Sequence, residues 1–290
     1  MRVLITGAGG NIGRRLTRLF SRAHRVAALG HLDLDVTDPR AVRDRVLSER
    51  PDLVINCSVL GVDACERRPD LAHAINGEAP GALARAAEAA GARLLHFSSN
   101  YVFGGRRRGD PPYTEEDAPD PINTYGISKL EGERAVLAGG EHVLVRTSWV
   151  FGSGGGNLLS DVHRRLAAGE RVPLIQDTWA SVTYLEDLAA RVLEIVELGR
   201  PGLYHVVNEG HCSYLEFARA AAEILRLGRK AESVIEPVQE EKFRTGAPRP
   251  PWTPMRCLAS ERAGLAPLRP WREALEVYIK SDMSSAAVAP

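Results

Sequence analysis

Three side chains of this sequence could together move a proton to or from a carbonyl oxygen. Tyr125 and Lys129 are four positions apart, and the composition of the segment after Tyr125 predicts a helix, so both side chains leave the same face. A phenol is a poor acid–base group at neutral pH, but a fixed ammonium beside it lowers its pKa. Ser99, or its neighbour Ser98, follows the apolar run 93–97, where a hydroxyl could hydrogen-bond an oxygen that gains charge. We therefore expect Ser99, Tyr125 and Lys129 to form a catalytic set.

A glycine-rich turn near the amino end strengthens this interpretation, since Tyr-x-x-x-Lys alone arises easily by chance. Residues 2–6 form a short apolar run, followed by Gly7-Ala-Gly-Gly10-Asn-Ile-Gly13 and by a pattern of helical period over 14–20. Gly7 permits a tight turn, Gly10 lets a pyrophosphate approach the backbone, and Gly13 lets helix and strand pack closely. The helix would present its positive end to the phosphates. This segment predicts a dinucleotide site.

Together, the two motifs resemble the extended short-chain dehydrogenase/reductase family, whose glycine turn is G-x-x-G-x-x-G and whose catalytic set is Ser or Thr with Tyr-x-x-x-Lys. Within that family the chain is similar to the dTDP-4-dehydrorhamnose reductases. The matching strings are His96-Phe-Ser-Ser-Asn-Tyr-Val-Phe-Gly, Pro121-Ile-Asn-Thr-Tyr-Gly and Thr147-Ser-Trp-Val-Phe-Gly. The resemblance, with the alternating strands and helices of the first third of the chain, implies an α/β fold. The expected architecture is a Rossmann-like, doubly wound parallel sheet with a smaller carboxyl-terminal substrate lobe.

The resemblance also implies contacts with NADPH or NADH. The expected second strand, 25–29, ends in Gly30 and His31, where many NAD sites carry an acidic residue. Arg14, Arg15 and His31 could accept a 2′-phosphate, which favours NADPH. The cofactor-binding residues implied by the resemblance are Gly7, Gly10, Asn11, Ile12, Gly13, Arg14, His31, Asp35, Asn56, Cys57, Ser58, Ser98, Tyr125 and Lys129. The implied substrate contacts are Val62, Asp63, Asn100 and Trp149.

By resemblance, the chain would reduce the 4-keto group of a nucleotide-linked 6-deoxyhexose, converting dTDP-4-dehydro-L-rhamnose to dTDP-L-rhamnose. Tyr125 would protonate the forming alkoxide, Lys129 would hold the ribose and lower the phenol pKa, and Ser99 would stabilise the oxyanion. Two departures leave alternatives open, because Asn100 stands where the family has an aspartate and 177–183 differs from the family's sugar-pocket string. The alternatives are a reductase or epimerase of another sugar nucleotide, as in deoxysugar or antibiotic pathways, and a non-catalytic NADP-binding regulatory subunit like that of methionine adenosyltransferase.

The expected domain boundaries follow a glycine-rich link near the middle of the chain. We expect a dinucleotide-binding domain over 1–155, to which the chain returns at about 183–207. Residues 156–182 and 208–280 are expected to form the substrate-binding lobe. The small, polar tail 281–290 is expected to be flexible.

Local signals predict individual elements. Asp38 and Pro39 predict the N-cap and first position of a helix over 39–49. The arginine triplet 106–108 is more typical of solvated charge than of a pyrophosphate contact.

Composition bounds the class of protein. The 290 residues carry no formal net charge, so no basic field would attract nucleic acid. No secretory leader and no apolar run near 18 residues are visible, which predicts a cytoplasmic enzyme without a membrane span. The cysteines show neither C-x-x-C nor zinc spacing, so reduced thiols and no metal are expected at Cys57, Cys65, Cys212 and Cys257. The expected partner is a nucleotide sugar, and a homodimer stays open.

Overall fold

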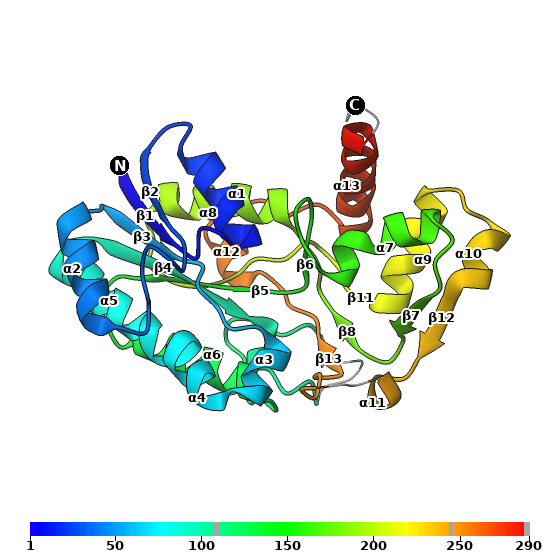
Figure 1. Ribbon diagram of the computed structural model, residues 1–290, viewed down its shortest axis with the longest axis horizontal. Helices are drawn as coiled ribbons and strands as arrows, with labels where there is room; N and C mark the ends of the chain where they lie inside the picture. Colours follow the sequence, from blue (N-terminus) through cyan, green and yellow to red (C-terminus); the bar gives the residue numbers. More distant parts are fainter. Residues whose placement is uncertain (107–108, 110, 244–245, 287–290) are drawn as a thin grey trace.

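A six-stranded, wholly parallel sheet forms the centre of one half of the molecule in this computed structural model, which describes residues 1–106, 109, 111–243 and 246–286 (Figure 1). The sheet order is β10-β5-β4-β3-β1-β2. Its strands are β1 (Arg2–Thr6), β2 (Arg25–Leu29), β3 (Leu53–Asn56), β4 (Arg93–Ser99), β5 (Val143–Thr147) and β10 (Gly202–His205). The arrangement confirms the predicted doubly wound α/β fold.

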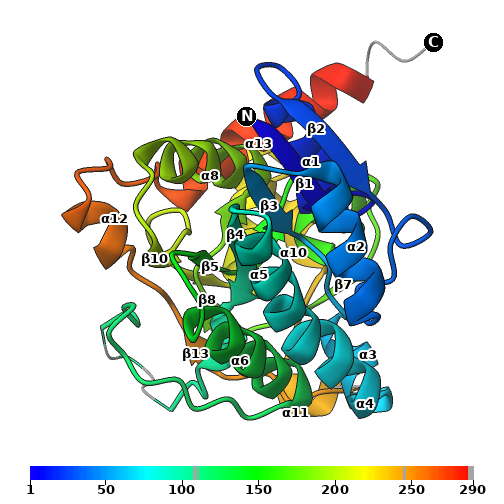
Figure 2. The same cartoon turned by 90° about the vertical axis from the view of Figure 1, so that its left-hand side faces the viewer.

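Helices cover both faces of this sheet (Figure 2). One face packs against α1 (Asn11–Phe20) and α8 (Leu185–Leu198). The other packs against α2 (Pro39–Glu49), α5 (Ala79–Ala89) and α6 (Thr124–Leu137). The two cores alternate along each strand, as Val3 and Ile5 of β1 point to the first face and Leu4 to the second. Both faces of the sheet are therefore buried, as expected of parallel strands.

Short helices join β3 to the rest of the first half. They are α3 (Val62–Arg67), α4 (Pro69–Ala72) and a π-helical segment, His73–Glu78, that runs directly into α5. The predicted helix over 39–49 is confirmed, because the Asp38 carboxylate accepts hydrogen bonds from the backbone N–H of Arg40 and Ala41. After β4, a single 3-10 turn covers Asn100–Val102.

A second core lies beside the sheet and contains Phe151, Phe217 and Tyr278 (Figure 1, right). Its helices are α7 (Leu158–Ala167), α9 (Tyr214–Ile224), α10 (Arg229–Val234) and α13 (Trp271–Ala286). Two short helices lie outside this core: α11 (Glu240–Phe243), and α12 (Leu258–Arg262), which packs on β10 of the central sheet. The short strands of this half pair as β7 (Val172–Ile175) with β12 (Ile235–Val238), β6 (Val150–Phe151) with β9 (Thr183–Tyr184), and β8 (Trp179–Ala180) with both β11 (Cys212–Ser213) and β13 (Trp252–Thr253). A role of this half in substrate binding stays a prediction.

The flexibility expected of the tail 281–290 stays a prediction, and residues 281–286 are helical. Helix α13 continues to Ala286 because Asp282 contacts His163 Nε2 of α7 at 2.9 Å, which holds the late turns of the helix against the second core. Residues 287–290 lie outside the described residues, as do Arg107 and Arg108 of the arginine triplet.

Within the described residues, no helix is both long and apolar enough to cross a bilayer. The same residues contain no group of three or more His, Cys, Asp or Glu side chains that could hold a metal ion. All four cysteines are free thiols.

Candidate active site

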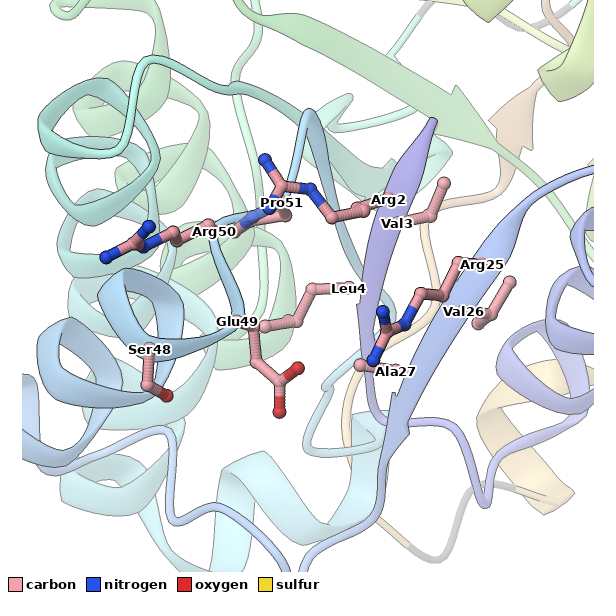
Figure 3. Close-up of a pocket in the computed structure, with 10 residues that line it drawn as sticks. All are labelled: Arg2, Val3, Leu4, Arg25, Val26, Ala27, Ser48, Glu49, Arg50 and Pro51. Carbon is pink, nitrogen blue, oxygen red and sulfur yellow. The ribbon is translucent and has the colours of Figure 1, made fainter.

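Cavities lie at both the amino and the carboxyl ends of the strands of the central sheet. One, of about 360 Å³, lies at the amino ends of β1 and β2 and is lined by Arg2, Arg25 and Arg50 (Figure 3). Their guanidinium groups point in different directions and do not converge on a common point (Figure 3). Because ligands of open parallel sheets bind at the carboxyl ends of the strands, this cavity is a poor candidate for the active site.

The second cavity, of about 210 Å³, lies at the carboxyl ends of β4 and β5. Its lining joins the glycine turn, the loop after β3, the ends of β4 and β5, and the first two turns of α6. The lining residues are Ile12, Cys57, Ser58, Val59, Phe97, Ser98, Ser99, Tyr125, Lys129, Thr147, Ser148, Trp149 and Val150. The three residues of the expected catalytic set, Ser99, Tyr125 and Lys129, therefore line the same cavity. Their roles stay predictions.

The glycine turn has room for no side chain at two positions. Gly7 has φ +64°, and a Cβ there would lie 2.5 Å from the carbonyl carbon of Cys57. A Cβ on Gly13 would lie 2.3 Å from the carbonyl oxygen of Gly7. Gly10 precedes the first residue of α1, and its N–H donates to the Gly7 carbonyl at 3.0 Å. The turn that leads into the positive end of α1 therefore lies directly against the loop that follows β3.

Ser99 and Tyr125 meet between β4 and α6. The Ser99 hydroxyl donates to Asn100 Oδ1 at 3.1 Å and accepts from the Tyr101 N–H at 3.2 Å. Burial raises the pKa of Tyr125 to about 12, while its hydrogen bond with Ser99 acts in the opposite direction. The prediction that this pKa is lowered is therefore wrong, because burial outweighs the hydrogen bond. At neutral pH the Tyr125 phenol holds its proton.

Lys129 is buried, with 2 % of its surface exposed. Its Nζ donates to the carbonyl oxygen of Phe97 at 2.6 Å and contacts His96 Nε2 at 3.2 Å. Burial lowers the pKa of Lys129 to about 8, and the nearby Glu133 carboxylate acts in the opposite direction. Lys129 therefore sits in a site that disfavours its charged form.

Two hydroxyls in the cavity wall have no hydrogen-bond partner among the described residues. Ser98 Oγ and Ser148 Oγ are both buried, at the ends of neighbouring strands. Buried polar groups are normally paired, so two such hydroxyls in one cavity fit a polar ligand that would supply the partner. Sequence reasoning missed Ser148. The available signal was a hydroxyl directly after the strand 143–147. Ser98 and Ser99 occupy the corresponding place at the end of β4.

The predicted substrate contacts lie on several elements. Trp149 lines the cavity and has the unusual backbone φ of +39°. Its ring packs against that of Tyr214, with centroids 3.9 Å apart and the planes tilted by 32°. Asn100 is buried and donates from Nδ2 to Thr253 Oγ1 at 2.7 Å. Strain at Trp149 is typical of a functional position.

Val62 and Asp63 begin α3 and do not line the 210 Å³ cavity. Asp63 accepts two hydrogen bonds from the Arg249 guanidinium, at 2.8 and 2.9 Å. This ion pair ties α3 to the chain segment before β13 and lowers the pKa of Asp63, chiefly through the hydrogen bond from Arg249. Sequence reasoning gave no sign of Arg249 as the partner, because the two residues lie far apart in the chain.

The residues expected around the adenosine lie away from the cavity as well. His31 and Asp35 are exposed after β2, and Asp35 accepts from the N–H and hydroxyl of Thr37, which lowers its pKa. Arg14 donates to the Gly154 carbonyl at 3.1 Å. Arg15 does not remain free for a phosphate, because it forms an ion pair with Glu186 of α8.

Asn56 and Asn11 complete the predicted set. Asn56 ends β3, is fully buried, and accepts from Thr6 Oγ1 at 2.8 Å. It therefore lies beneath the cavity and supports the loop that carries Cys57 and Ser58. Asn11 is the first residue of α1, next to the glycine turn.

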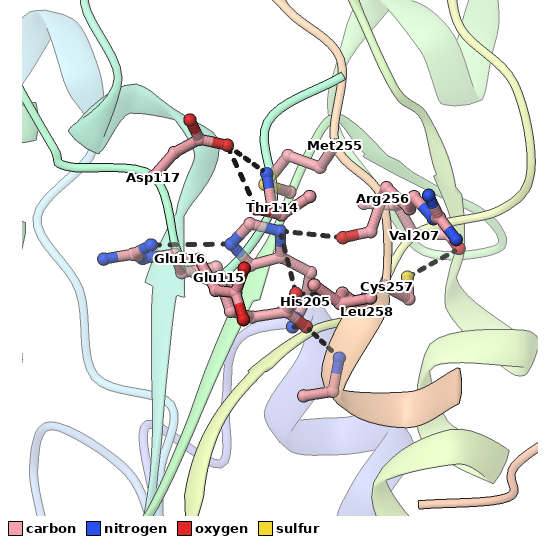
Figure 4. A network of polar contacts seen from close by, with 12 residues as sticks. Thr114, Glu115, Glu116, Asp117, His205, Val207, Met255, Arg256, Cys257 and Leu258 are labelled. Atoms are coloured by element: carbon pink, nitrogen blue, oxygen red, sulfur yellow. Dashed lines mark hydrogen bonds and ion pairs between the residues drawn. The ribbon is translucent and has the colours of Figure 1, made fainter. Parts of the chain in front are cut away.

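A network outside the cavity fixes the loop that leads to Tyr125 (Figure 4). The Glu115 carboxylate accepts from the backbone N–H of His205 at 2.7 Å, of Leu258 at 3.0 Å and of Ala259 at 3.2 Å. One buried acid thereby joins the loop to β10 and to the start of α12. Sequence reasoning missed Glu115, because it appears there as one of several acids in a polar loop.

Comparison with known proteins agrees with this geometry. The family model of the RmlD substrate binding domain matches residues 1–284. The dTDP-4-dehydrorhamnose reductase of Mycolicibacterium smegmatis is 41 % identical, with 100 % of this chain and 88 % of the relative covered. The crystal structure of dTDP-4-dehydrorhamnose reductase from Bacillus anthracis in complex with NADP has a TM-score of 0.90 at 32 % identity, covering 97 % and 99 % of the two chains. The enzyme from Clostridium acetobutylicum gives the same TM-score and identity over 98 % and 100 %. The chain belongs to the RmlD substrate binding domain family.

Proposed function

We propose that this protein is an oxidoreductase that uses NADPH to reduce the 4-keto group of a dTDP-linked 6-deoxyhexose, converting dTDP-4-dehydro-L-rhamnose to dTDP-L-rhamnose. The observation that carries the proposal is the convergence of Ser99, Tyr125 and Lys129 on one cavity at the carboxyl ends of β4 and β5. The names of the full-length relatives support the choice of substrate.

In this proposal Tyr125 is the proton donor. A donor must hold its proton at the working pH, and the raised pKa of Tyr125 ensures that it does. Ser99 contacts Tyr125 and would orient the carbonyl oxygen toward it. The bound cofactor supplies the hydride. Transfer of the phenol proton to that oxygen then completes the alcohol.

The residues at the cavity fit a dinucleotide. Gly7 and Gly13 leave the backbone of the turn bare, so a pyrophosphate can lie against the positive end of α1. Ser98 and Ser148 offer unpaired hydroxyls within the cavity. We propose Arg14 and His31, both exposed, as the contacts of a 2′-phosphate, which makes NADPH the preferred cofactor and NADH the weaker one.

We place the sugar against Trp149, whose ring is held by Tyr214 of the second half. Asn100 lies beside Ser99 and keeps this end of the site neutral where the family has an aspartate. Residues 156–182 and 208–280 then act as the substrate-binding lobe, with Val62 and Asp63 at its boundary with α3. The free cysteines fit a reducing compartment, and we propose a cytoplasmic location.

The test is consumption of NADPH and NADH with enzymatically prepared dTDP-4-dehydro-L-rhamnose. We expect Tyr125→Phe to lower turnover by roughly 10²–10⁴-fold, the usual contribution of a positioned acid, while cofactor binding persists. The matched control is Tyr204→Phe, which removes a buried phenol on β10 whose hydroxyl donates to the Arg200 carbonyl. That variant should turn over normally.

Cofactor binding without turnover of this substrate would exclude the rhamnose assignment. Other dTDP-linked 4-keto sugars would then be the next substrates to assay. Turnover that survives Tyr125→Phe would instead remove Tyr125 from its assigned role.

A further inference from the structure

A row of buried polar side chains crosses three strands of the central sheet and ends at Lys129. Thr6, Asn56 and His96 lie side by side in register on β1, β3 and β4. Each stands two residues after a leucine or valine of the core beneath α2, α5 and α6, so all three face that layer of helices. Lys129 of α6 meets the row at His96.

The amide of Asn56 has one allowed orientation. Its Oδ1 lies 3.0 Å from the backbone N–H of Ser58 and 2.8 Å from Thr6 Oγ1. A backbone N–H can only donate, so the atom facing Ser58 must be the oxygen. The amide nitrogen Nδ2 therefore faces His96 Nδ1, at 3.0 Å.

This orientation selects the tautomer of His96. Asn56 Nδ2 has only hydrogens to offer, so His96 Nδ1 must accept, and the proton of the neutral ring lies on Nε2. The ring is neutral because burial holds the pKa of His96 well below its usual value. The Nε2–H group then points at Lys129 Nζ, 3.2 Å away.

An Nε2–H donor needs an acceptor, and the form of Lys129 decides whether it has one. An ammonium carries three hydrogens and no lone pair, so it would face His96 donor to donor. A neutral amine can accept from Nε2–H while it donates to the Phe97 carbonyl at 2.6 Å. Only the neutral amine satisfies every contact in the row.

We propose that His96 is a positioning residue that favours the neutral amine of Lys129 over the ammonium in the free protein, so that binding of NADPH draws a proton from solvent onto Lys129. The inference rests on the proposed function for the identity of the cofactor. Ribose hydroxyls would supply acceptors for the ammonium and so favour the charged form. His96 thereby links cofactor binding to the protonation of Lys129.

Among the other titratable groups around Lys129, the Glu133 carboxylate favours the charged form, but its own charge is compensated by an arginine. Glu133, one turn along α6, has both carboxylate oxygens bound by Arg146. The thiol of Cys57 after β3 stays neutral because burial raises its pKa to about 12. Burial likewise raises the pKa of Cys65 on α3, and Tyr125 on α6 keeps its proton. Burial lowers the pKa of Lys129 itself to about 8, in line with the geometry.

The sequence makes a direct measurement practical, because it contains only four lysines, and Lys230, Lys242 and Lys280 are exposed. In protein labelled with ¹³C at lysine Cε, we expect the Lys129 signal to titrate near pH 8. Saturating NADP⁺ should move the Lys129 titration up by at least one pH unit. Calorimetry at pH 8.5 in two buffers should show uptake of about 0.5 proton or more per NADP⁺ bound.

Two variants test the role of His96. His96→Phe removes the Nε2–H donor and should raise the titration of Lys129 toward the ordinary lysine value of 10.5. Asn56→Asp offers a carboxylate oxygen to His96 Nδ1, moves the ring proton there, and should raise the titration further. In the double variant, His96→Phe with Asn56→Asp, the rise in the Lys129 titration caused by Asn56→Asp must be smaller. Without the imidazole, only the added charge acts on Lys129. His142→Gln, which replaces a buried histidine before β5, should leave the titration of Lys129 unchanged.

A Lys129 signal that titrates at the ordinary lysine value of 10.5 overturns the inference without any variant. An unchanged midpoint in folded His96→Phe overturns it as well. If NADP⁺ gives no heat and shifts no signal, the proposed function fails, while the titration of the free protein still decides the role of His96.

Discussion

Helix α6 carries two buried ionisable side chains one turn apart, and their surroundings differ. Glu133 is 1 % exposed, and Arg146 donates to both of its oxygens, at 2.8 and 2.6 Å. Lys129 is 2 % exposed and meets a carbonyl oxygen and an imidazole, with no carboxylate paired to it among the described residues. The paired charge holds α6 to β5. Lys129, which has no such partner, faces the cavity, where a ligand can supply a hydrogen-bond acceptor.

The largest effect should come from breaking the paired charge. Glu133→Ala leaves Arg146 buried without its carboxylate, and we expect a loss of about 3–5 kcal/mol in the free energy of unfolding. Urea denaturation measures this loss. Replacing both partners, as in Glu133→Leu with Arg146→Met, should recover most of it.

The matched control lies on the surface. Glu276→Gln breaks an exposed pair with Lys280 on α13 and should cost roughly 0.3–0.5 kcal/mol. A Glu133→Ala variant as mild as this control would show that the buried pair contributes little to the attachment of α6.

The unpaired charge should make stability depend on pH. Burial lowers the pKa of Lys129 from 10.5 to about 8, so between these values the unfolded chain binds more protons than the folded one. The stability contribution of Lys129 is therefore complete above pH 10.5 and is lost as the pH falls through 8, a change of up to about 3 kcal/mol. The difference in unfolding free energy between the native protein and Lys129→Met should rise with pH across this window. Parallel curves would contradict the assignment.

At pH 7 the same substitution should act in the opposite direction to Glu133→Ala. Lys129→Met replaces a buried charge by an apolar chain of similar length, and we expect stabilisation by about 1–2 kcal/mol. Turnover should fall sharply in the same variant. A loss of stability comparable to that of Glu133→Ala would show that Lys129 is a structural residue.

Sequence reasoning found the features that short segments determine. The glycine turn follows from the spacing of Gly7, Gly10 and Gly13, and the start of α2 follows from Asp38 and Pro39, because each depends on neighbours within a few residues. The helical spacing of Tyr125 and Lys129 likewise placed both on the cavity wall. The parallel sheet followed from the alternation of strands and helices.

The features that escaped depend on contacts between distant segments. The Arg15–Glu186 pair joins α1 to α8, and the Asp63–Arg249 pair joins α3 to the segment before β13. Each pair forms only when segments far apart in the chain come together. The raised pKa of Tyr125 depends on how deeply α6 is buried, which a spacing rule does not report. The last turns of α13 form for the same reason, since Asp282 finds its partner on α7.

Ser148 is the smallest of these omissions and gives the mildest expected effect. Its hydroxyl is buried without a partner among the described residues, so Ser148→Ala should change stability by less than about 1 kcal/mol. A ligand that completes the hydroxyl would lose one hydrogen bond, and the affinity for NADPH or for the sugar nucleotide should fall roughly 5–10-fold. Ser260→Ala removes another buried, unpaired hydroxyl that lies outside the cavity and should leave both affinities unchanged. Comparing the KM of each ligand in the two variants assigns Ser148 to the cofactor or to the sugar. Equal affinities in both variants would mean that no ligand forms a hydrogen bond with the Ser148 hydroxyl, in contrast to Lys129.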